Sequence, residues 1–162
     1  VFLCDVSGSM APYARALLTY ARAVQKARPR VRAFSFATRL TDLSSQRRSA
    51  PDPPDMGGGT RIGASLRAFH DGYARRGIAR GGTVVILSDG WERESPQLIA
   101  EEMARLRRLC RRIVWVNPQK KHPAYQPLAG GMAAALPYLD ALVEGHNLRT
   151  IAAVADAIEG TT

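Results

Sequence analysis

Apolar and polar residues follow two different periods along this chain. Short, densely apolar runs predict strands, and segments in which apolar residues recur at steps of three and four predict helices. The predicted strands are residues 1–5, 31–38, 84–87 and 113–116, with a short edge strand at 39–45. The predicted helices are residues 12–27, 60–73 and 95–112, and a last helix begins at Asn147, with Leu148, Ile151, Ala155 and Ile158 facing the core. Strands and helices therefore alternate through the chain.

Several of these segments carry their own local signals. Residues 84–87 are rich in β-branched side chains and flanked by turn residues, which is typical of a central strand buried on both faces. Ser95 and Pro96 predict the N-cap and the first position of the third helix. Residues 46–59 predict a loop, and residues 118–137, with four prolines and a Gly-Gly pair, predict an irregular segment.

The alternating order predicts an α/β fold with three layers, in which helices cover both faces of a mostly parallel, doubly wound, Rossmann-like sheet. The segment 39–45 would pair antiparallel at one edge. A chain of 162 residues can form one domain with a full hydrophobic core. We therefore expect residues 1–162 to be a single domain, excised from a longer chain because Val1 already lies in a strand.

Composition narrows the class of protein. The hydrophobic fraction of 46% is ordinary for a globular protein, and no apolar run reaches the roughly 18–20 residues that a membrane span needs. Cys4 and Cys110 lie in apolar surroundings, so we expect buried free thiols rather than a disulfide framework. Such thiols fit a reducing compartment, and the expected location is the cytoplasm.

The charge is strongly unbalanced. The net charge is +9, and all but three of the 23 basic residues are arginine. A charge of this size favours acidic partners and speeds encounter with them. Nucleic-acid binding is the less favoured interpretation, because the arginines are spread over several segments, few aromatic residues lie among them and no recognition motif accompanies them.

Small polar side chains gather where predicted strands and helices meet their loops. They are Asp5 at the end of the first strand with Ser7 and Ser9 after it, Thr60 after three glycines, and Asp89 in the Ser88-Asp89-Gly90 turn after the strand at 84–87. In an open α/β sheet, the loops at the carboxyl ends of the strands lie together. The loops at 5–10, 57–61 and 88–92 can therefore bring two carboxylates and three hydroxyls to one point.

Every donor in this set is a hard oxygen, which suits Mg²⁺ or Mn²⁺ rather than zinc or copper. Only two formal negative charges would balance the 2+ ion, so an incoming carboxylate from a partner would be attracted and could complete the coordination. Each residue also has a plain structural alternative, such as a helix N-cap for Thr60 or a turn position for Asp89.

The Asp5-Xaa-Ser7-Xaa-Ser9 motif, Thr60 and Asp89-Gly90 resemble the metal-ion-dependent adhesion site (MIDAS) of von Willebrand factor type A (VWA) domains. The resemblance covers nearly the whole chain and implies a VWA fold that binds a protein and catalyses no reaction. It implies that Ser7, Ser9 and Thr60 offer hydroxyls to the metal, and that Asp5 and Asp89 act largely through bound water.

Other residues on these loops are candidates for contact with the partner. They are Met10, Gly59, Gly90, Trp91 and Glu92. An exposed Trp91 would be an anchor for a partner, whereas a buried one would be ordinary packing, and the sequence leaves both open.

The second half of the chain resembles the CoxE-like branch of this family. The residues that carry this resemblance are Trp115-Val-Asn117-Pro118, Tyr125, Gly131-Met132, Leu136-Pro137 and Gly145-His146-Asn147-Leu148. The branch implies a bacterial, intracellular partner of a MoxR-type AAA+ ATPase that helps to mature or assemble a metalloenzyme of the carbon monoxide dehydrogenase type. The main alternative is a VWA subunit of another ATPase complex, such as a chelatase that inserts metal into tetrapyrroles.

A metal-dependent hydrolase is an alternative from another class. It is disfavoured because Ser7 stands where an enzyme of the aspartyl-phosphate type would want a second carboxylate. The sequence also lacks a phosphate-cradling loop and a Gly-x-Ser-x-Gly elbow.

Overall fold

The computed structural model describes residues 1–43, 59–121, 130–145 and 156–158. Within these residues, six strands form one sheet in the order β3-β2-β1-β4-β5-β6. They are β1 (Phe2–Asp5), β2 (Ala33–Phe36), β3 (Leu40–Asp42), β4 (Thr83–Leu87), β5 (Arg112–Asn117) and β6 (Ala141–Glu144). Neighbouring strands are parallel except for β2 and β3. This confirms the predicted mostly parallel sheet with one antiparallel edge strand.

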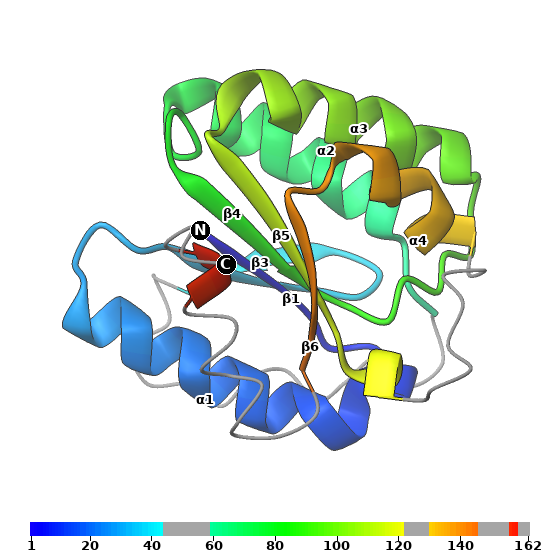
Figure 1. The fold of residues 1–162 in the computed structure, drawn as a ribbon, viewed down its shortest axis with the longest axis horizontal. Helices are drawn as coiled ribbons and strands as arrows, with labels where there is room; N and C mark the ends of the chain where they lie inside the picture. Colours follow the sequence, from blue (N-terminus) through cyan, green and yellow to red (C-terminus); the bar gives the residue numbers. More distant parts are fainter. Residues whose placement is uncertain (44–58, 122–129, 146–155, 159–162) are drawn as a thin grey trace.

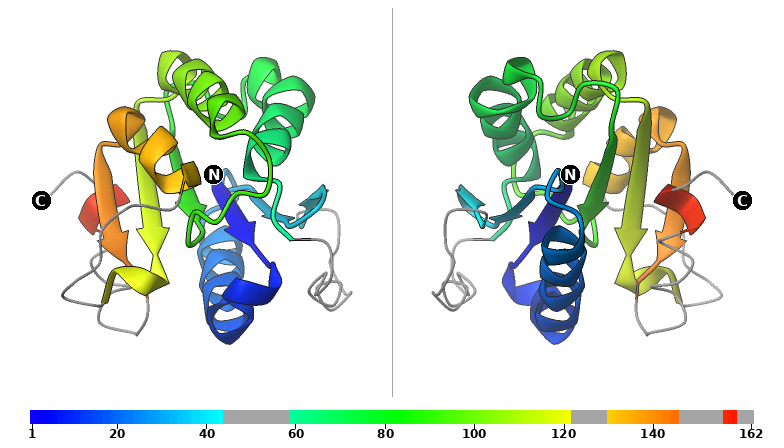
Figure 2. Two further views of the ribbon diagram at one scale, coloured as in Figure 1. Left: turned by 90° about the vertical axis from the view of Figure 1, so that its right-hand side faces the viewer. Right: turned by 90° about the vertical axis from the view of Figure 1, so that its left-hand side faces the viewer.

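Helices cover both faces of the sheet (Figure 1, Figure 2). The helix α1 (Ala11–Ala27) lies on one face, and α2 (Ile62–Gly72), α3 (Pro96–Leu109) and α4 (Gly130–Ala135) lie on the other. In β4, Val84 and Ile86 pack in the core beneath α2 and α3, whereas Val85 and Leu87 pack in the core beside α1. The strand is buried on both faces, and the predicted three-layer α/β fold is confirmed.

The starts of two helices differ from the prediction in detail. Ser95 occupies the N-cap of α3 and Pro96 its first position, but the Ser95 hydroxyl donates to the Gln97 side chain instead of capping the helix. The helix α2 begins at Ile62, after Arg61 at the N-cap. The prediction that Thr60 opens this helix is therefore wrong by two residues.

Several short elements lie where the sequence predicted none. The helix α4 and the 3₁₀ turn η4 (Leu136–Tyr138) fall within the segment predicted to be irregular. A six-residue helix that starts with two glycines is too short to show helical periodicity. The edge strand β6 is only partly buried along its four residues, so it lacks a dense apolar signal.

Two other predictions fall largely outside the described residues. The predicted loop is described only at Gly59, and the predicted last helix only at residues 156–158, which form a helical turn. In this turn Ala157 is buried in the core beside α1.

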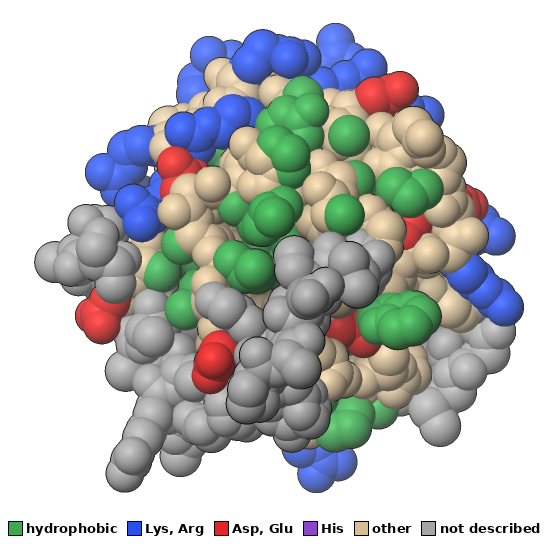
Figure 3. Space-filling model, turned by 45° about the vertical axis from the view of Figure 1, so that its right-hand side comes forward, with side chains coloured by type: hydrophobic (Ala, Val, Ile, Leu, Met, Phe, Trp, Pro, Cys, Tyr) green, Lys and Arg blue, Asp and Glu red, His purple; other side chains and the backbone are tan. Residues whose placement is uncertain are grey.

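The surface is strongly basic over the α2–α3 layer. The exposed arginines of α2, the 3₁₀ turn η2 (Ala74–Arg76) and α3 are Arg67, Arg75, Arg76, Arg107 and Arg108. Figure 3 shows Lys and Arg side chains along the upper rim of the molecule, where α2 and α3 lie in Figure 1.

Cys4 and Cys110 are buried free thiols, as predicted. Among the helices in the described ranges, none is long and apolar enough to cross a membrane.

Candidate metal centre

The loop after β1 holds Asp5 in a fixed orientation. The Asp5 carboxylate is buried, and each of its oxygens accepts a hydrogen bond. The Ser7 backbone N–H donates to Oδ1 at 2.9 Å, and the Ser88 hydroxyl donates to Oδ2 at 2.7 Å. Because Ser88 follows β4, which pairs with β1, the second bond joins the two neighbouring strand ends. The bond spans 83 positions, and no local sequence signal could have revealed it.

Ser7 and Ser9 place two hydroxyls beside Asp5. Their Oγ atoms lie 3.3 Å apart, with Ser7 buried and Ser9 exposed. Ser7 is the N-cap residue of the 3₁₀ turn η1 (Gly8–Met10), but its side chain makes no capping hydrogen bond. Both hydroxyls line one pocket of about 290 Å³.

Thr60 reaches the same pocket from the loop before α2. Its side chain is buried, and its backbone carbonyl accepts a hydrogen bond from the Arg93 N–H at 3.1 Å. The preceding Gly59 has a φ of +69°, and a Cβ at this position would lie 2.4 Å from Cδ of Arg93. Glycine therefore allows the loop before α2 to pack against the loop after β4.

Asp89 provides the second carboxylate of the site. Its Oδ1 accepts a hydrogen bond from the Trp91 N–H at 3.1 Å. Its Oδ2 is buried and has no hydrogen-bond partner within the described part of the chain. A buried carboxylate oxygen without a donor is costly in free energy, so this atom would gain from a cation or a water molecule.

The loop that carries Asp89 is held from two sides. In β5, the Trp115 indole N–H donates to the Ser88 carbonyl at 2.8 Å, and the Asn117 amide donates to the Asp89 carbonyl at 3.1 Å. On the other side, α4 approaches so closely that a Cβ on Gly131 would lie 2.6 Å from the Gly90 carbonyl oxygen. These contacts fix the backbone of the loop, and the sequence did not reveal them.

Glu92 caps α2 from the loop after β4. Its Oε2 accepts a hydrogen bond from the Gly63 N–H at 2.9 Å, in the first turn of α2. Its Oε1 accepts from the N–H groups of Arg93 and Glu94 at 2.8 and 2.9 Å. A carboxylate at a helix N-terminus is favourable, because it satisfies a free N–H and complements the helix dipole.

The electrostatics of the site favour a cation. Burial raises the pKa of the Asp5 carboxyl to about 6; hydrogen bonds from Ser7 and Ser88 oppose the rise, and the nearby Asp89 adds to it. A raised pKa means that the anion is disfavoured, so a bound cation would relieve the cost of burying both carboxylates. The described residues contain no cluster of three or more His, Cys, Asp and Glu side chains suited to a metal. A metal at this point would therefore need oxygen ligands besides the two carboxylates, and the hydroxyls of Ser7, Ser9 and Thr60 are the nearby candidates.

The residues predicted to contact a partner lie in different environments. Met10 is fully buried in the core beside α1, and Gly90 is buried against Met132. Gly59 and Glu92 line the pocket, although the carboxylate of Glu92 is already hydrogen-bonded to three backbone groups. The side chain of Trp91 is 67% exposed, which excludes the interpretation as ordinary buried packing.

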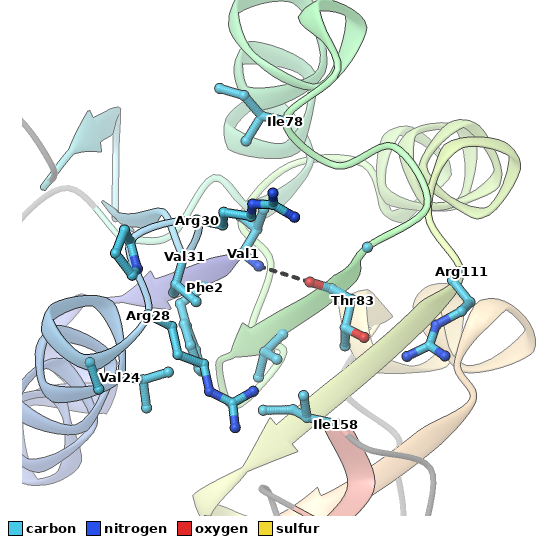
Figure 4. A pocket seen from close by; sticks show the side chains of 14 residues that line it. Val1, Phe2, Val24, Arg28, Arg30, Val31, Ile78, Thr83, Arg111 and Ile158 are labelled. Carbon is cyan, nitrogen blue, oxygen red and sulfur yellow. Dashed lines mark hydrogen bonds between the residues drawn. The ribbon is translucent and has the colours of Figure 1, made fainter.

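A larger pocket of about 820 Å³ lies at the opposite, amino-terminal ends of the strands (Figure 4). Its lining is mostly apolar, with Arg28, Arg30 and Arg111 among it. None of the described residues that line it carries a carboxylate, imidazole or thiol, so these residues offer no metal ligand comparable to those near Asp5. Volume alone therefore does not identify the site.

Comparisons with known proteins agree with this fold. Residues 1–151 match the family model described as a VWA domain containing CoxE-like protein. A search of curated proteins finds no significant match. Among solved structures, the chain is similar to a von Willebrand factor type A protein from Catenulispora acidiphila, with 14% identity and a TM-score of 0.65. It is also similar to proximal thread matrix protein 1 from the mussel byssus, a structure with a zinc-occupied MIDAS motif, with 18% identity and a TM-score of 0.58.

These structural matches cover 99% of this chain but only 41% and 44% of the two solved chains. The chain therefore spans about two fifths of the length of the proteins that it resembles, and at these identities the likeness shows the fold. The family model, in contrast, extends over almost all of the sequence. The chain belongs to the CoxE-like family of VWA domains.

Proposed function

We propose that this chain binds a divalent cation, Mg²⁺ or Mn²⁺, and uses it to recognise a carboxylate on a protein partner. The observation that carries the proposal is that three hydroxyl-bearing residues, Ser7, Ser9 and Thr60, line one small pocket. Two buried carboxylates adjoin this lining, because Asp5 accepts a hydrogen bond from the Ser7 N–H and Asp89 accepts one from the Trp91 N–H. The unpartnered Oδ2 of Asp89 adds a specific need for positive charge there. When bound, the cation would supply an electrophilic position for the partner's carboxylate.

In this proposal, Ser7, Ser9 and Thr60 give hydroxyl oxygens to the cation. Asp5 and Asp89 balance its charge, largely through bound water. Two carboxylates neutralise a 2+ ion without filling its coordination sphere, so a carboxylate from the partner could take a remaining position. Domains of this family are typically binding modules rather than enzymes, and we propose the same for this chain.

The donor set favours Mg²⁺ or Mn²⁺, because both prefer hard oxygen ligands. The mussel protein shows that a MIDAS motif can hold zinc in that protein. Zinc is therefore included as a competitor in the test below.

The proposed partner is a MoxR-type AAA+ ATPase, in the maturation or assembly of a metalloenzyme of the carbon monoxide dehydrogenase type, in the cytoplasm. Membership of the CoxE-like family supports this proposal. The second candidate is a VWA subunit of another ATPase complex, such as a metal chelatase for tetrapyrroles. Identification of the ATPase that co-purifies with the protein would separate the two.

Thermal unfolding in the presence of Mg²⁺, Mn²⁺ or Zn²⁺ tests the metal site. A ligand that binds only the folded state at a hundredfold excess over its Kd stabilises by about 2.7 kcal/mol. For a domain of this size that corresponds to a rise of roughly 5–10 °C in the unfolding midpoint. We expect this rise with Mg²⁺ and Mn²⁺, with acetate added to fill the open position.

Two variants make the test specific. Asp89→Asn keeps the shape of the side chain and its Oδ1 acceptor but removes the charge, and we expect it to lose the metal-dependent rise. Asp71→Asn removes an exposed carboxylate in α2 that lies 4.0 Å from Arg75, and we expect it to respond like the wild type. An equal response in wild type and Asp89→Asn, or none in either, would contradict the proposal.

A further inference from the structure

Trp91 stands out because a large aromatic side chain is left in water beside the candidate metal pocket. It is 67% exposed and lines the pocket together with Ser7, Ser9 and Thr60. Among the large hydrophobic side chains of the described residues, Leu136, at 41%, is the other exposed one. An exposed indole at the rim of a binding pocket is suited to contact a partner, because tryptophan offers a large apolar area with little flexibility.

The backbone under Trp91 is fixed although its ring is exposed. The Trp91 N–H donates to Asp89, and Gly90 packs against Met132 of α4. The next residue, Glu92, is held to the first turn of α2 through Gly63. The indole is therefore attached to backbone that already has a defined position relative to the hydroxyls. Binding would restrict little additional backbone motion, so its entropy cost would be small.

We propose that the partner presents an acidic side chain together with an apolar side chain within a few residues of it, on one segment of a protein. The carboxylate enters the pocket at Ser7, Ser9 and Thr60, and the apolar side chain packs on Trp91. The inference rests on the proposed function and adds a determinant of specificity to it. The net charge of +9 favours an acidic segment, and the exposed Trp91 favours an apolar residue next to the acid.

Selection from a random heptapeptide library displayed on phage tests the proposal directly. The immobilised 162-residue chain is incubated with the library in Mg²⁺ buffer, and bound phage are released with EDTA. We expect the wild type to enrich peptides that contain Asp or Glu with an aromatic or aliphatic residue within three positions. Selection on Trp91→Ser should still enrich peptides that contain Asp or Glu, but without a preference for an apolar residue near the acid.

Two control variants separate the possible results. Leu136→Ser removes the other exposed apolar side chain and should retain the wild-type preference. Selection on Asp89→Asn should yield no enriched peptides that EDTA releases. Thermal unfolding of Trp91→Ser with and without Mg²⁺ should match the wild type, which shows that the substitution spares the fold and the metal site.

Results that overturn this inference differ from results that also overturn the proposed function. Enrichment of acid without an apolar neighbour in the wild type, or an apolar preference that survives Trp91→Ser, overturns the inference and leaves the proposed function standing. An absence of peptides released by EDTA, together with no metal-dependent rise in the unfolding midpoint, overturns both.

Fluorescence provides a second, independent measurement. The chain has two tryptophans, and Trp115 is fully buried. A selected peptide should shift the emission of the wild type to shorter wavelength by covering Trp91, and it should cause no shift in Trp91→Ser. We expect Trp91→Ser to bind this peptide about tenfold more weakly, as for an aromatic anchor at an interface. A shift of equal size in both proteins, or equal affinity, contradicts the inference.

Discussion

Ser88 is the residue that joins the two carboxylate-bearing loops. Its hydroxyl donates to Asp5 at 2.7 Å and accepts a hydrogen bond from the Gly90 N–H at 3.1 Å, and the residue is fully buried. Asp5 is oriented by a side chain from the neighbouring strand end, and Gly90 by the same side chain. One hydroxyl therefore contributes to the position of both halves of the candidate metal site.

Ser88→Ala should destabilise the protein and weaken metal binding together. The substitution leaves buried groups on Asp5 and Gly90 without a partner, which costs about 1–3 kcal/mol. Urea unfolding measures the stability, and titration with Mn²⁺ measures the affinity. Ser95→Ala is the matched control, because Ser95 is exposed and its hydroxyl does not cap α3. Equal unfolding midpoints for Ser88→Ala and the wild type would contradict this role.

At the scale of single residues, the sequence predicted which polar side chains follow the strands. Asp5 and Asp89 were recognisable because a carboxylate directly after a densely apolar run has few structural reasons to be there. The role of Ser88 was not recognisable, because its partner lies 83 positions away. The exposure of Trp91 could not be predicted either, since it depends on what the neighbouring loops cover.

At the scale of elements, α4 acts as a support for the loop after β4. A Cβ on Gly131 would lie 2.6 Å from the Gly90 carbonyl oxygen and 2.9 Å from Cδ1 of Ile99. Glycine is needed here because backbone meets backbone, and a carbonyl cannot rotate away as a long side chain can. The position of Asp89 therefore depends on a short helix that follows β5 in the sequence.

Gly131→Ala should push α4 and the Asp89 loop apart. We expect a loss of about 1–3 kcal/mol in the free energy of unfolding, as for overpacking in a core, and weaker binding of Mn²⁺. Urea unfolding and metal titration measure the two effects. Gly72→Ala is the matched control, because a Cβ at Gly72 meets nothing within 4 Å and alanine favours helix. If both variants behave like the wild type, α4 does not position the loop.

The start of α2 shows a similar dependence between elements. The sequence pointed to Thr60 as the start, because a threonine after glycines is a good N-cap candidate. In the structure, the carboxylate of Glu92, which lies on another loop, accepts a hydrogen bond from the backbone N–H of Gly63 in the first turn of α2. Thr60 lines the pocket instead. A cap supplied by a distant residue cannot be read from the residues that surround the helix start.

At the scale of the whole molecule, much of the exposed positive charge lies away from the candidate site, although the exposed Arg93 lines the pocket. The exposed arginines of α2, η2 and α3 lie over one face of the sheet, whereas the pocket lies at the carboxyl ends of the strands. The arginines can attract an acidic partner over a distance without taking part in the metal site.

The exposed arginines predict weak, non-specific binding of polyanions. We expect a gel shift with duplex DNA at about 50 mM salt to disappear by about 200 mM, because binding by charge alone falls steeply as salt rises. The shift should be the same for Asp89→Asn, since the arginines are unchanged. Sequence-dependent binding that persists at the higher salt would instead favour a nucleic-acid-binding function.

The sequence by itself determined the class of fold, most of the strands and helices, and the presence of hard oxygen donors after two strands. It could do so because strand and helix periods, proline positions and buried apolar runs are local properties. The tertiary structure alone decided the edge strand β6, the support of the Asp89 loop by α4, the capping of α2 by Glu92 and the exposure of Trp91. Each of these depends on contacts between segments far apart in the chain, and such contacts leave no local pattern.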